Sequence, residues 1–76
     1  MPTLHRLGNR LVKMYPRDHE PPHFHLEAPN FAVKIELGTW RVVRIAGRAR
    51  DLGEVLEWAR ENEALLWRRW HETRSG

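Results

Sequence analysis

The spacing of hydrophobic residues changes once along this chain, near residue 50, and this change constrains the fold more than any other feature. Up to about Ala46, apolar residues alternate with polar ones or form short runs, which is typical of β-strands. After Asp51 they recur every three to four residues, as in an amphipathic helix. Because neither element can bury its apolar side alone, the two parts must pack together. The sequence therefore predicts a single α+β domain over residues 1–76, with a sheet over about 10–46 and a helical segment over about 51–73.

Four short segments in the first part have the composition of strands. The connections between them are as short as those of hairpins, and Pro16 ends the first because proline donates no ladder hydrogen bond. We therefore expect a small antiparallel sheet, a meander of three or four strands, packed against the helical segment. The expected strands are Arg10–Tyr15, His23–Glu27, Phe31–Leu37 and Trp40–Ile45.

The helical part begins with a capping signal and contains one polar break. Asp51 is a suitable N-cap residue, and Glu54 stands three residues later, in the capping-box position. The apolar stripe is interrupted at Asn62 and Glu63, where the next turn would need apolar residues. The sequence predicts either one bent helix or two helices at the C-terminus. Their apolar residues are Leu52, Val55, Leu56, Ala59, Leu65, Leu66 and Trp70.

Composition excludes several classes of protein. The 76 residues include no cysteine, so neither disulfides nor thiolate metal sites stabilise the chain. No apolar run reaches the ~18 residues of a membrane span, and the N-terminus lacks the apolar core of a signal peptide. We therefore expect a cytoplasmic protein without a membrane partner. Thirteen basic against ten acidic residues give a net charge of +3, which mildly favours an anionic partner.

The helical part is rich in tryptophan and arginine. Four tryptophans in so short a chain indicate a core that depends on aromatic bulk. Trp58 lies off the apolar stripe, so its indole belongs either to the core or to an interface with a partner. Arg68, Arg69 and Arg74 lie near the end of the chain, where cations interact favourably with the helix dipole.

The second expected strand alternates between apolar and ionisable side chains. Phe24 and Leu26 belong to the apolar set and should face the helical segment. Because successive side chains of a strand point to opposite faces, His23, His25 and Glu27 should share the other, uncovered face. The parity of this strand thus predicts two imidazoles on the outside of the sheet.

The segment from residue 18 to residue 25 carries the strongest chemical signal. It contains three of the five histidines of the chain and two consecutive prolines that stiffen the backbone. In the metal hypothesis, three imidazoles bind one divalent transition metal such as zinc and leave one position open, as in catalytic sites. The predicted ligands are His19, His23 and His25, with Asp18, Glu20 or Glu27 as a further ligand or an outer hydrogen-bond partner.

Two other interpretations of this segment stay open. In the first, imidazoles act as general acid and base while arginines hold a phosphate, and RNA is cleaved through its own 2′-hydroxyl group. In the second, the histidines are structural and hydrogen-bond across the sheet to Glu27 or Glu36, while Asp18 caps a turn. The catalytic candidates are Tyr15, Asp18, His19, His23 and His25, and the candidates for anion or nucleic-acid binding are Arg17, Arg41 and Arg44.

A series of short motifs makes the chain similar to a known family. The motifs are Met14-Tyr15, Asp18-His19, Pro21-Pro22-His23-Phe24-His25, the hydrophobic strand Phe31–Leu37, and the tryptophans Trp58 and Trp70. In this pattern the chain resembles the small bacterial domain-of-unknown-function 4160 family over nearly its whole length. It departs from the family pattern in the stretch before residue 50, where Gly47 is present but no proline follows.

The resemblance implies a cytoplasmic bacterial protein that is often encoded beside another very small protein, as in toxin–antitoxin-like pairs. It implies no established activity or cofactor, and it marks Tyr15, Asp18, His19, His23 and His25 as the special surface. We therefore expect a binding module that acts through a cognate small protein or through another copy of itself. The alternative is a histidine cluster for metal binding or acid–base chemistry, with RNA or another phosphoester as substrate. Whether the protein is an enzyme stays open.

Overall fold

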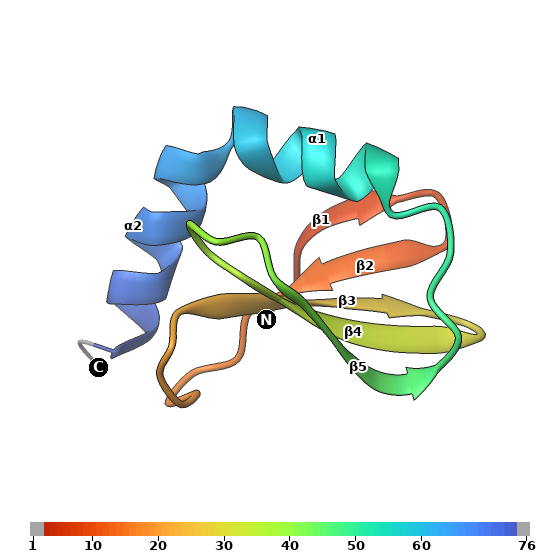
Figure 1. Ribbon diagram of the computed structural model, residues 1–76. Coiled ribbons are helices and arrows are strands. Elements are labelled where there is room, and N and C mark those ends of the chain that lie inside the picture. The colour runs from red at the N-terminus through yellow and green to blue at the C-terminus, as the bar shows by residue number, and fades with distance from the viewer. Residues whose placement is uncertain (1–2, 75–76) are drawn as a thin grey trace.

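The computed structural model describes residues 3–74, which form a five-stranded antiparallel sheet followed by two helices (Figure 1). The strands lie side by side in the order in which they follow along the chain, so the predicted meander and the α+β class are confirmed. The elements are β1 Thr3–Leu7, β2 Arg10–Lys13, β3 His23–Ala28, β4 Phe31–Glu36, β5 Val42–Gly47, α1 Gly53–Glu61 and α2 Glu63–Arg74.

The predicted number of strands was wrong because β1 was not expected. β1 pairs with β2 across a two-residue connection, Gly8-Asn9, in which Gly8 has a positive φ of 62°. Glycine adopts this conformation without steric cost, and such a pair between two strands is a hairpin signal. The last strand also begins later than expected, at Val42, because Trp40 has a positive φ of 62° in the turn after β4.

One face of the sheet carries the hydrophobic core. In β4, buried Phe31, Val33 and Ile35 alternate with partly exposed residues. Residues opposite each other in an antiparallel pair share a face. Phe24 lies opposite Ile35, and Leu26 lies opposite Val33. Both β3 residues are fully buried in the core, so the predicted parity of this strand is confirmed.

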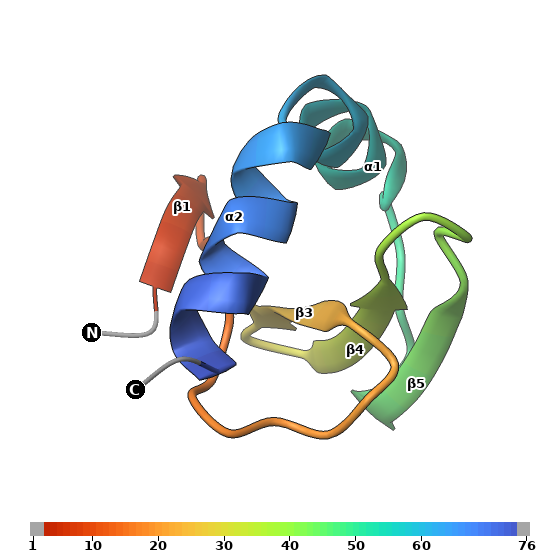
Figure 2. The ribbon, with the colours of Figure 1, turned by 90° about the vertical axis from the view of Figure 1, so that its left-hand side faces the viewer.

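The two helices cover the core face and one end of the sheet. α1 lies over the face and contributes the buried residues Val55 and Ala59. α2 crosses the end of the sheet where β3 begins and contributes Leu66 and Trp70 (Figure 2). Asn62 ends α1, which confirms the predicted break in its two-helix form. Within the described chain, neither helix is long and apolar enough to cross a membrane.

The predicted capping box is wrong. α1 begins after Leu52, which makes no side-chain capping hydrogen bond, and Asp51 takes a positive φ of 57°. The side chain of Glu54 instead forms an ion pair with Arg10 of β2, with a distance of 3.0 Å between Oε1 and Nη2. The same guanidinium donates a hydrogen bond from Nη1 to the backbone oxygen of Asp51 at 2.6 Å. A contact between distant segments therefore replaces the local cap.

The tryptophan that lies off the helical stripe covers the first strand. The indole of Trp58 is half-buried and stacks on the ring of His5, with centroids 4.5 Å apart and an angle of 8° between the planes. This stack attaches α1 to β1. Trp58 therefore packs against the core, as the first of its two interpretations predicted.

Candidate metal centre

A group of ionisable side chains lies where β3 begins. The rings of His23 and His25 have centroids 5.1 Å apart, and Asp18 reaches both from the loop between β2 and β3. One oxygen of this carboxylate, Oδ2, lies 2.8 Å from Nε2 of His23 and 3.0 Å from Nε2 of His25. The three side chains offer candidate ligand atoms that all lie within 4.8 Å of one another. We refer to Asp18, His23 and His25 as the histidine cluster.

Both histidines lie on the sheet face opposite the core, but they differ in exposure. His25 lies opposite Lys34 of β4, and 16% of its side chain is exposed. His23 lies opposite Glu36 and is only 3% exposed. The indole of Trp70 packs on the ring of His23 with a centroid distance of 5.4 Å. The expectation that this face is uncovered was therefore wrong at His23, because the end of α2 and the preceding loop close over it.

The last turn of α2 is fastened to the loop that carries Asp18. Arg74 donates a hydrogen bond from Nη1 to the backbone oxygen of Asp18 at 2.7 Å. Its Nε lies 3.4 Å from the carboxylate of Glu20, and its guanidinium lies over the ring of Trp70 at 5.1 Å. The role expected for Arg74, an interaction with the helix dipole, missed these contacts because they join residues far apart in the sequence.

A neutral imidazole cannot satisfy both contacts of His23. Its Nδ1 lies 2.8 Å from the carbonyl oxygen of Pro21, which can only accept, so Nδ1 must carry the hydrogen. A neutral imidazole has a single N–H, and its Nε2 would then turn a lone pair toward the carboxylate of Asp18 at 2.8 Å. Either a second proton or a metal ion must therefore lie between these two atoms. An N–H donated to a backbone carbonyl is also the usual outer contact of a metal-binding histidine.

The carboxyl group of Asp18 is ionised at neutral pH. Burial by itself raises its pKa, but hydrogen bonds from His25 and His23 and the charge on His23 outweigh burial. The pKa of Asp18 therefore lies below its ordinary value of 3.8. The backbone N–H of His19 also donates a hydrogen bond to the other carboxylate oxygen, at 3.2 Å. The cluster thus presents one anionic oxygen to two imidazole nitrogens.

A second polar group adjoins the histidine cluster on the same face. The ring of Tyr15 contacts that of His25 edge-on at 4.9 Å, and its hydroxyl donates a hydrogen bond to Glu27. Lys13 forms an ion pair with the same carboxylate at 2.9 Å. The hydrogen bond to Glu27, followed by burial and the charges of Glu27 and Asp18, raises the pKa of Tyr15 to about 12. The phenol is therefore protonated at neutral pH and acts as a hydrogen-bond donor.

The remaining predicted site residues lie outside the histidine cluster. His19 follows Asp18 directly, but its side chain is exposed. Arg17 is exposed in the same loop and has a positive φ of 62°. Arg41 is exposed just before β5, and Arg44 is exposed within β5, where it donates a hydrogen bond to the backbone oxygen of Gly47 at 3.2 Å. The anion-binding candidates thus come from two separate segments.

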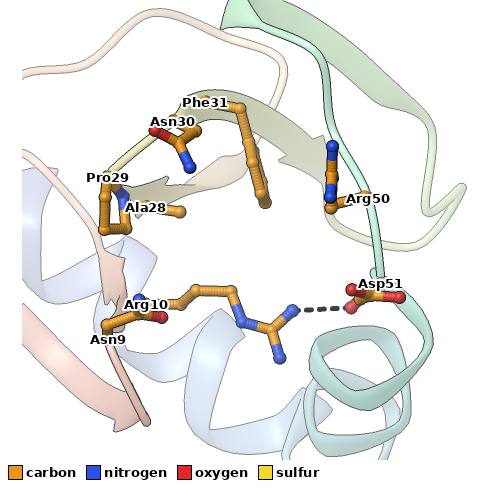
Figure 3. A pocket seen from close by; sticks show the side chains of 8 residues that line it. All are labelled: Asn9, Arg10, Ala28, Pro29, Asn30, Phe31, Arg50 and Asp51. Atoms are coloured by element: carbon orange, nitrogen blue, oxygen red, sulfur yellow. Dashed lines mark hydrogen bonds between the residues drawn. The ribbon is translucent and has the colours of Figure 1, made fainter.

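A pocket of about 250 Å³ lies at the other end of β3 (Figure 3). The side chain of Arg10 reaches into it and is held by the backbone oxygen of Asp51. Because Ala28 ends β3 whereas His23 begins it, the pocket and the histidine cluster are separate sites. Its lining residues are Asn9, Arg10, Ala28, Pro29, Asn30, Phe31, Arg50 and Asp51.

Comparison with known proteins gives a family. The family model described as Domain of unknown function (DUF4160) matches residues 10–71, which is more than half of the chain. The chain belongs to the DUF4160 family. The match includes the whole histidine cluster of this DUF4160 protein and begins at β2, so β1 lies outside it. No curated protein and no solved structure matches the chain.

Proposed function

We propose that this DUF4160 protein binds a divalent transition metal, with zinc as the representative, through Asp18, His23 and His25. The observation that carries the proposal is the 2.8 Å contact between Nε2 of His23 and the carboxylate of Asp18, where a metal ion would replace the second proton of the imidazole, since Nδ1 donates to Pro21. Two imidazole nitrogens and one carboxylate oxygen are a donor set that zinc accepts. Three protein ligands leave one position of a tetrahedral site open.

The cluster must contract at one pair of ligand atoms and widen at the other two to hold the ion. Zinc–ligand bonds of about 2.0–2.1 Å in a tetrahedron place neighbouring ligand atoms roughly 3.3 Å apart. The carboxylate oxygen of Asp18 lies 2.8 Å and 3.0 Å from the two imidazole nitrogens, and all three atoms lie within 4.8 Å of one another. The two contacts with Asp18 must lengthen by about 0.3–0.5 Å, and the two imidazole nitrogens must approach each other by at most about 1.5 Å. The hydrogen bond to Pro21 already fixes the ring of His23 in a ligating orientation.

Equilibrium dialysis against zinc, followed by elemental analysis and calorimetry, tests the proposal. The wild-type chain should bind one ion. Asp18→Asn, which keeps the shape of the side chain, and His25→Ala should each weaken binding by about 100-fold or more, the upper end of the effect seen for outer-contact residues. His19→Ala is the matched control, since it removes an imidazole from the same loop outside the cluster and should leave affinity unchanged.

Three results would contradict the proposal. The first is a wild-type chain that binds no zinc in stoichiometric amount. The second is unchanged affinity in both Asp18→Asn and His25→Ala. The third is loss of binding in His19→Ala but not in Asp18→Asn, which would favour the ligand set predicted from the sequence. Circular dichroism of each variant shows whether the fold persists.

The open position supports a finer proposal, hydrolysis of a phosphoester such as RNA. Zinc supplies an activated water when it is bound at a site of this kind. Arg17 is exposed and directly precedes Asp18 in the chain, and in this proposal its guanidinium holds a phosphate group. A short single-stranded RNA should be cleaved by the zinc-loaded protein and protected by EDTA. Cleavage should disappear in Asp18→Asn and persist in His19→Ala. Intact RNA with the loaded protein would refute hydrolysis and leave metal binding in place.

The binding-module hypothesis stays a prediction beside this proposal. Its support is the family assignment together with the resemblance described above. A cognate small protein, a toxin–antitoxin-like pairing and a cytoplasmic location are all parts of it. Co-purification of the tagged chain with the product of a neighbouring gene tests the first two.

A further inference from the structure

Strand β5 is more exposed than the other strands of the sheet. Five of its six residues are exposed, whereas β4 alternates regularly between buried and half-buried residues. Among residues 3–74, the large hydrophobic side chains classed as exposed are Val42 and Ile45, at 38% and 54%, and both belong to β5. Two such residues in one short strand are more than the isolated exposed residue that needs no explanation.

The outer edge of β5 lies open in this part of the chain. β5 is the last strand of the sheet and pairs with β4 alone among the described elements. Figure 2 shows it on the side of the sheet away from β1 and α2. The backbone N–H and C=O groups along such an edge are a template on which another extended segment can pair.

The charge around β5 has a single sign. Residues 41–50 contain no aspartate and no glutamate. The arginines of this stretch are Arg41, Arg44, Arg48 and Arg50, and all four are exposed. An added strand would therefore meet apolar side chains among positive charges. The complementary segment alternates acidic and apolar residues.

We propose that the outer edge of β5 binds an extended acidic segment of another protein as a sixth strand. A second copy of this chain fits less well. Two-fold antiparallel pairing of β5 brings the middle of the strand beside itself, and Arg44 then lies close to its copy. Like charges in that arrangement are destabilising. Single-stranded RNA fits less well because it binds by stacking on aromatic rings, and β5 contains no aromatic residue.

Amide chemical shifts of the isotope-labelled full chain test this proposal. The probe is an acetylated and amidated eight-residue peptide of alternating glutamate and valine, with a lysine–valine peptide and a single-stranded oligouridine for comparison. The experiment is done in EDTA, so that it is independent of the metal proposal. The glutamate–valine peptide should shift the amides of β5 saturably and more weakly at high salt, and the two comparison ligands should not.

Two double variants with the same change in charge sharpen the test. Arg41→Glu with Arg48→Glu reverses two charges beside β5 and should weaken binding of the acidic peptide at least about 10-fold. Arg60→Glu with Arg68→Glu reverses two exposed charges on the helices and should leave binding unchanged. Ile45→Thr keeps the strand propensity and removes apolar contact area, so it should weaken binding about 3- to 10-fold.

The proposal is overturned by any of five results. The glutamate–valine peptide produces no saturable shifts, or the lysine–valine peptide binds equally well. The shifts fall on β1 or the helices in place of β5. Both double variants lose affinity equally. The oligouridine shifts the β5 amides while the acidic peptide does not, which would assign the edge to nucleic acid.

Discussion

The start of β3 and the length of β5 belong to one sheet, yet burial and polarity are inverted between them. The imidazole of His23 is 3% exposed, whereas the aliphatic side chain of Ile45 is 54% exposed. His23 is enclosed by the loop before it and by Trp70 of α2. Along the outer edge of β5, no strand or helix of residues 3–74 lies alongside. At these two positions, the presence or absence of covering elements therefore outweighs side-chain polarity in deciding burial.

The comparison also shows what burial of a polar group requires. Throughout residues 3–74, every buried side-chain nitrogen or oxygen has a hydrogen-bond partner. At His23 both ring nitrogens have acceptors, Pro21 and Asp18, that come from the same loop. A polar side chain can be enclosed at this end because the loop supplies these partners.

The largest expected effect is the loss of stability when the buried imidazole of His23 is removed, compared with a substitution of the exposed Ile45. His23→Ala leaves a cavity beside Trp70 and removes a partner of Asp18, and should lower the free energy of unfolding by about 2–4 kcal/mol. Ile45→Thr should change it by no more than about 0.5 kcal/mol, because the side chain is exposed. Denaturant unfolding in EDTA, followed by tryptophan fluorescence, measures both. Equal losses in the two variants would mean that the start of β3 and β5 do not differ in their contribution to stability.

The attachment of β5 to the sheet can be tested at its last residue. Gly47 has a positive φ of 68°, and a Cβ there would collide with the carbonyl oxygen of Asn30 and lie 2.9 Å from Cα of Phe31. Gly47→Ala should therefore lower the free energy of unfolding by about 2–3 kcal/mol.

Gly8→Ala is the matched control for this substitution. Gly8 has a positive φ of 62° but no atom near the position of an added Cβ. Its loss should be about 1 kcal/mol, from backbone strain alone. Similar losses in the two alanine variants would mean that Gly47 does not contact the β3–β4 turn closely.

The closure of α2 over the histidine cluster predicts a smaller effect. Arg74→Ala removes the contacts with Asp18, Glu20 and Trp70 together, and should lower the free energy of unfolding by about 0.5–1.5 kcal/mol. Zinc affinity should fall about 3- to 10-fold, because the loop that carries the carboxylate is less firmly held. Arg69→Ala removes an exposed ion pair with Glu72 and should cost at most about 0.5 kcal/mol. Unchanged zinc affinity in Arg74→Ala would mean that the contacts of α2 do not influence metal binding.

The smallest effect concerns pH. Tyr15 is the single tyrosine of the chain, so absorbance of tyrosinate reports on it alone, and its midpoint should lie near pH 12. Because the folded pKa is raised, the stability contributed by this phenol is fully present below pH 10 and is lost between pH 10 and about 12. Glu27→Gln removes the largest cause of the shift and should move the midpoint toward 10. A wild-type midpoint near 10 would mean that the hydrogen bond does not form.

Local rules predicted the parity of β3 and named Asp18 as a candidate, but they could not choose between Asp18 and His19 as the third member of the cluster. The inward direction of Phe24 and the shared face of His23 and His25 follow from the two-residue period of a strand. Asp18 and His19 are adjacent polar residues of a loop, and only the path of that loop turns the carboxylate toward the imidazoles while His19 stays exposed. A pattern of residue types contains no information about that path.

Contacts between residues far apart in the chain could not be predicted from the sequence either. Trp70 and Arg74 reach the loop from the end of α2, and Arg74 binds a residue 56 positions away. The pairing of Arg10 with Glu54, which replaced the expected capping box, is of the same kind. β1 is different, since the Gly8-Asn9 pair was a usable hairpin signal that the hydrophobic pattern alone did not reveal.

The three members of the histidine cluster all come from positions 18–25, within one hairpin. Closing so short a segment costs little chain entropy compared with bringing ligands together from distant elements. One short segment therefore supplies all three donor side chains, and α2 covers the cluster but contributes no donor to it. We therefore expect this segment to keep its donor set when it is transferred to another antiparallel hairpin, provided that the aromatic residue between the two imidazoles is buried there as it is here.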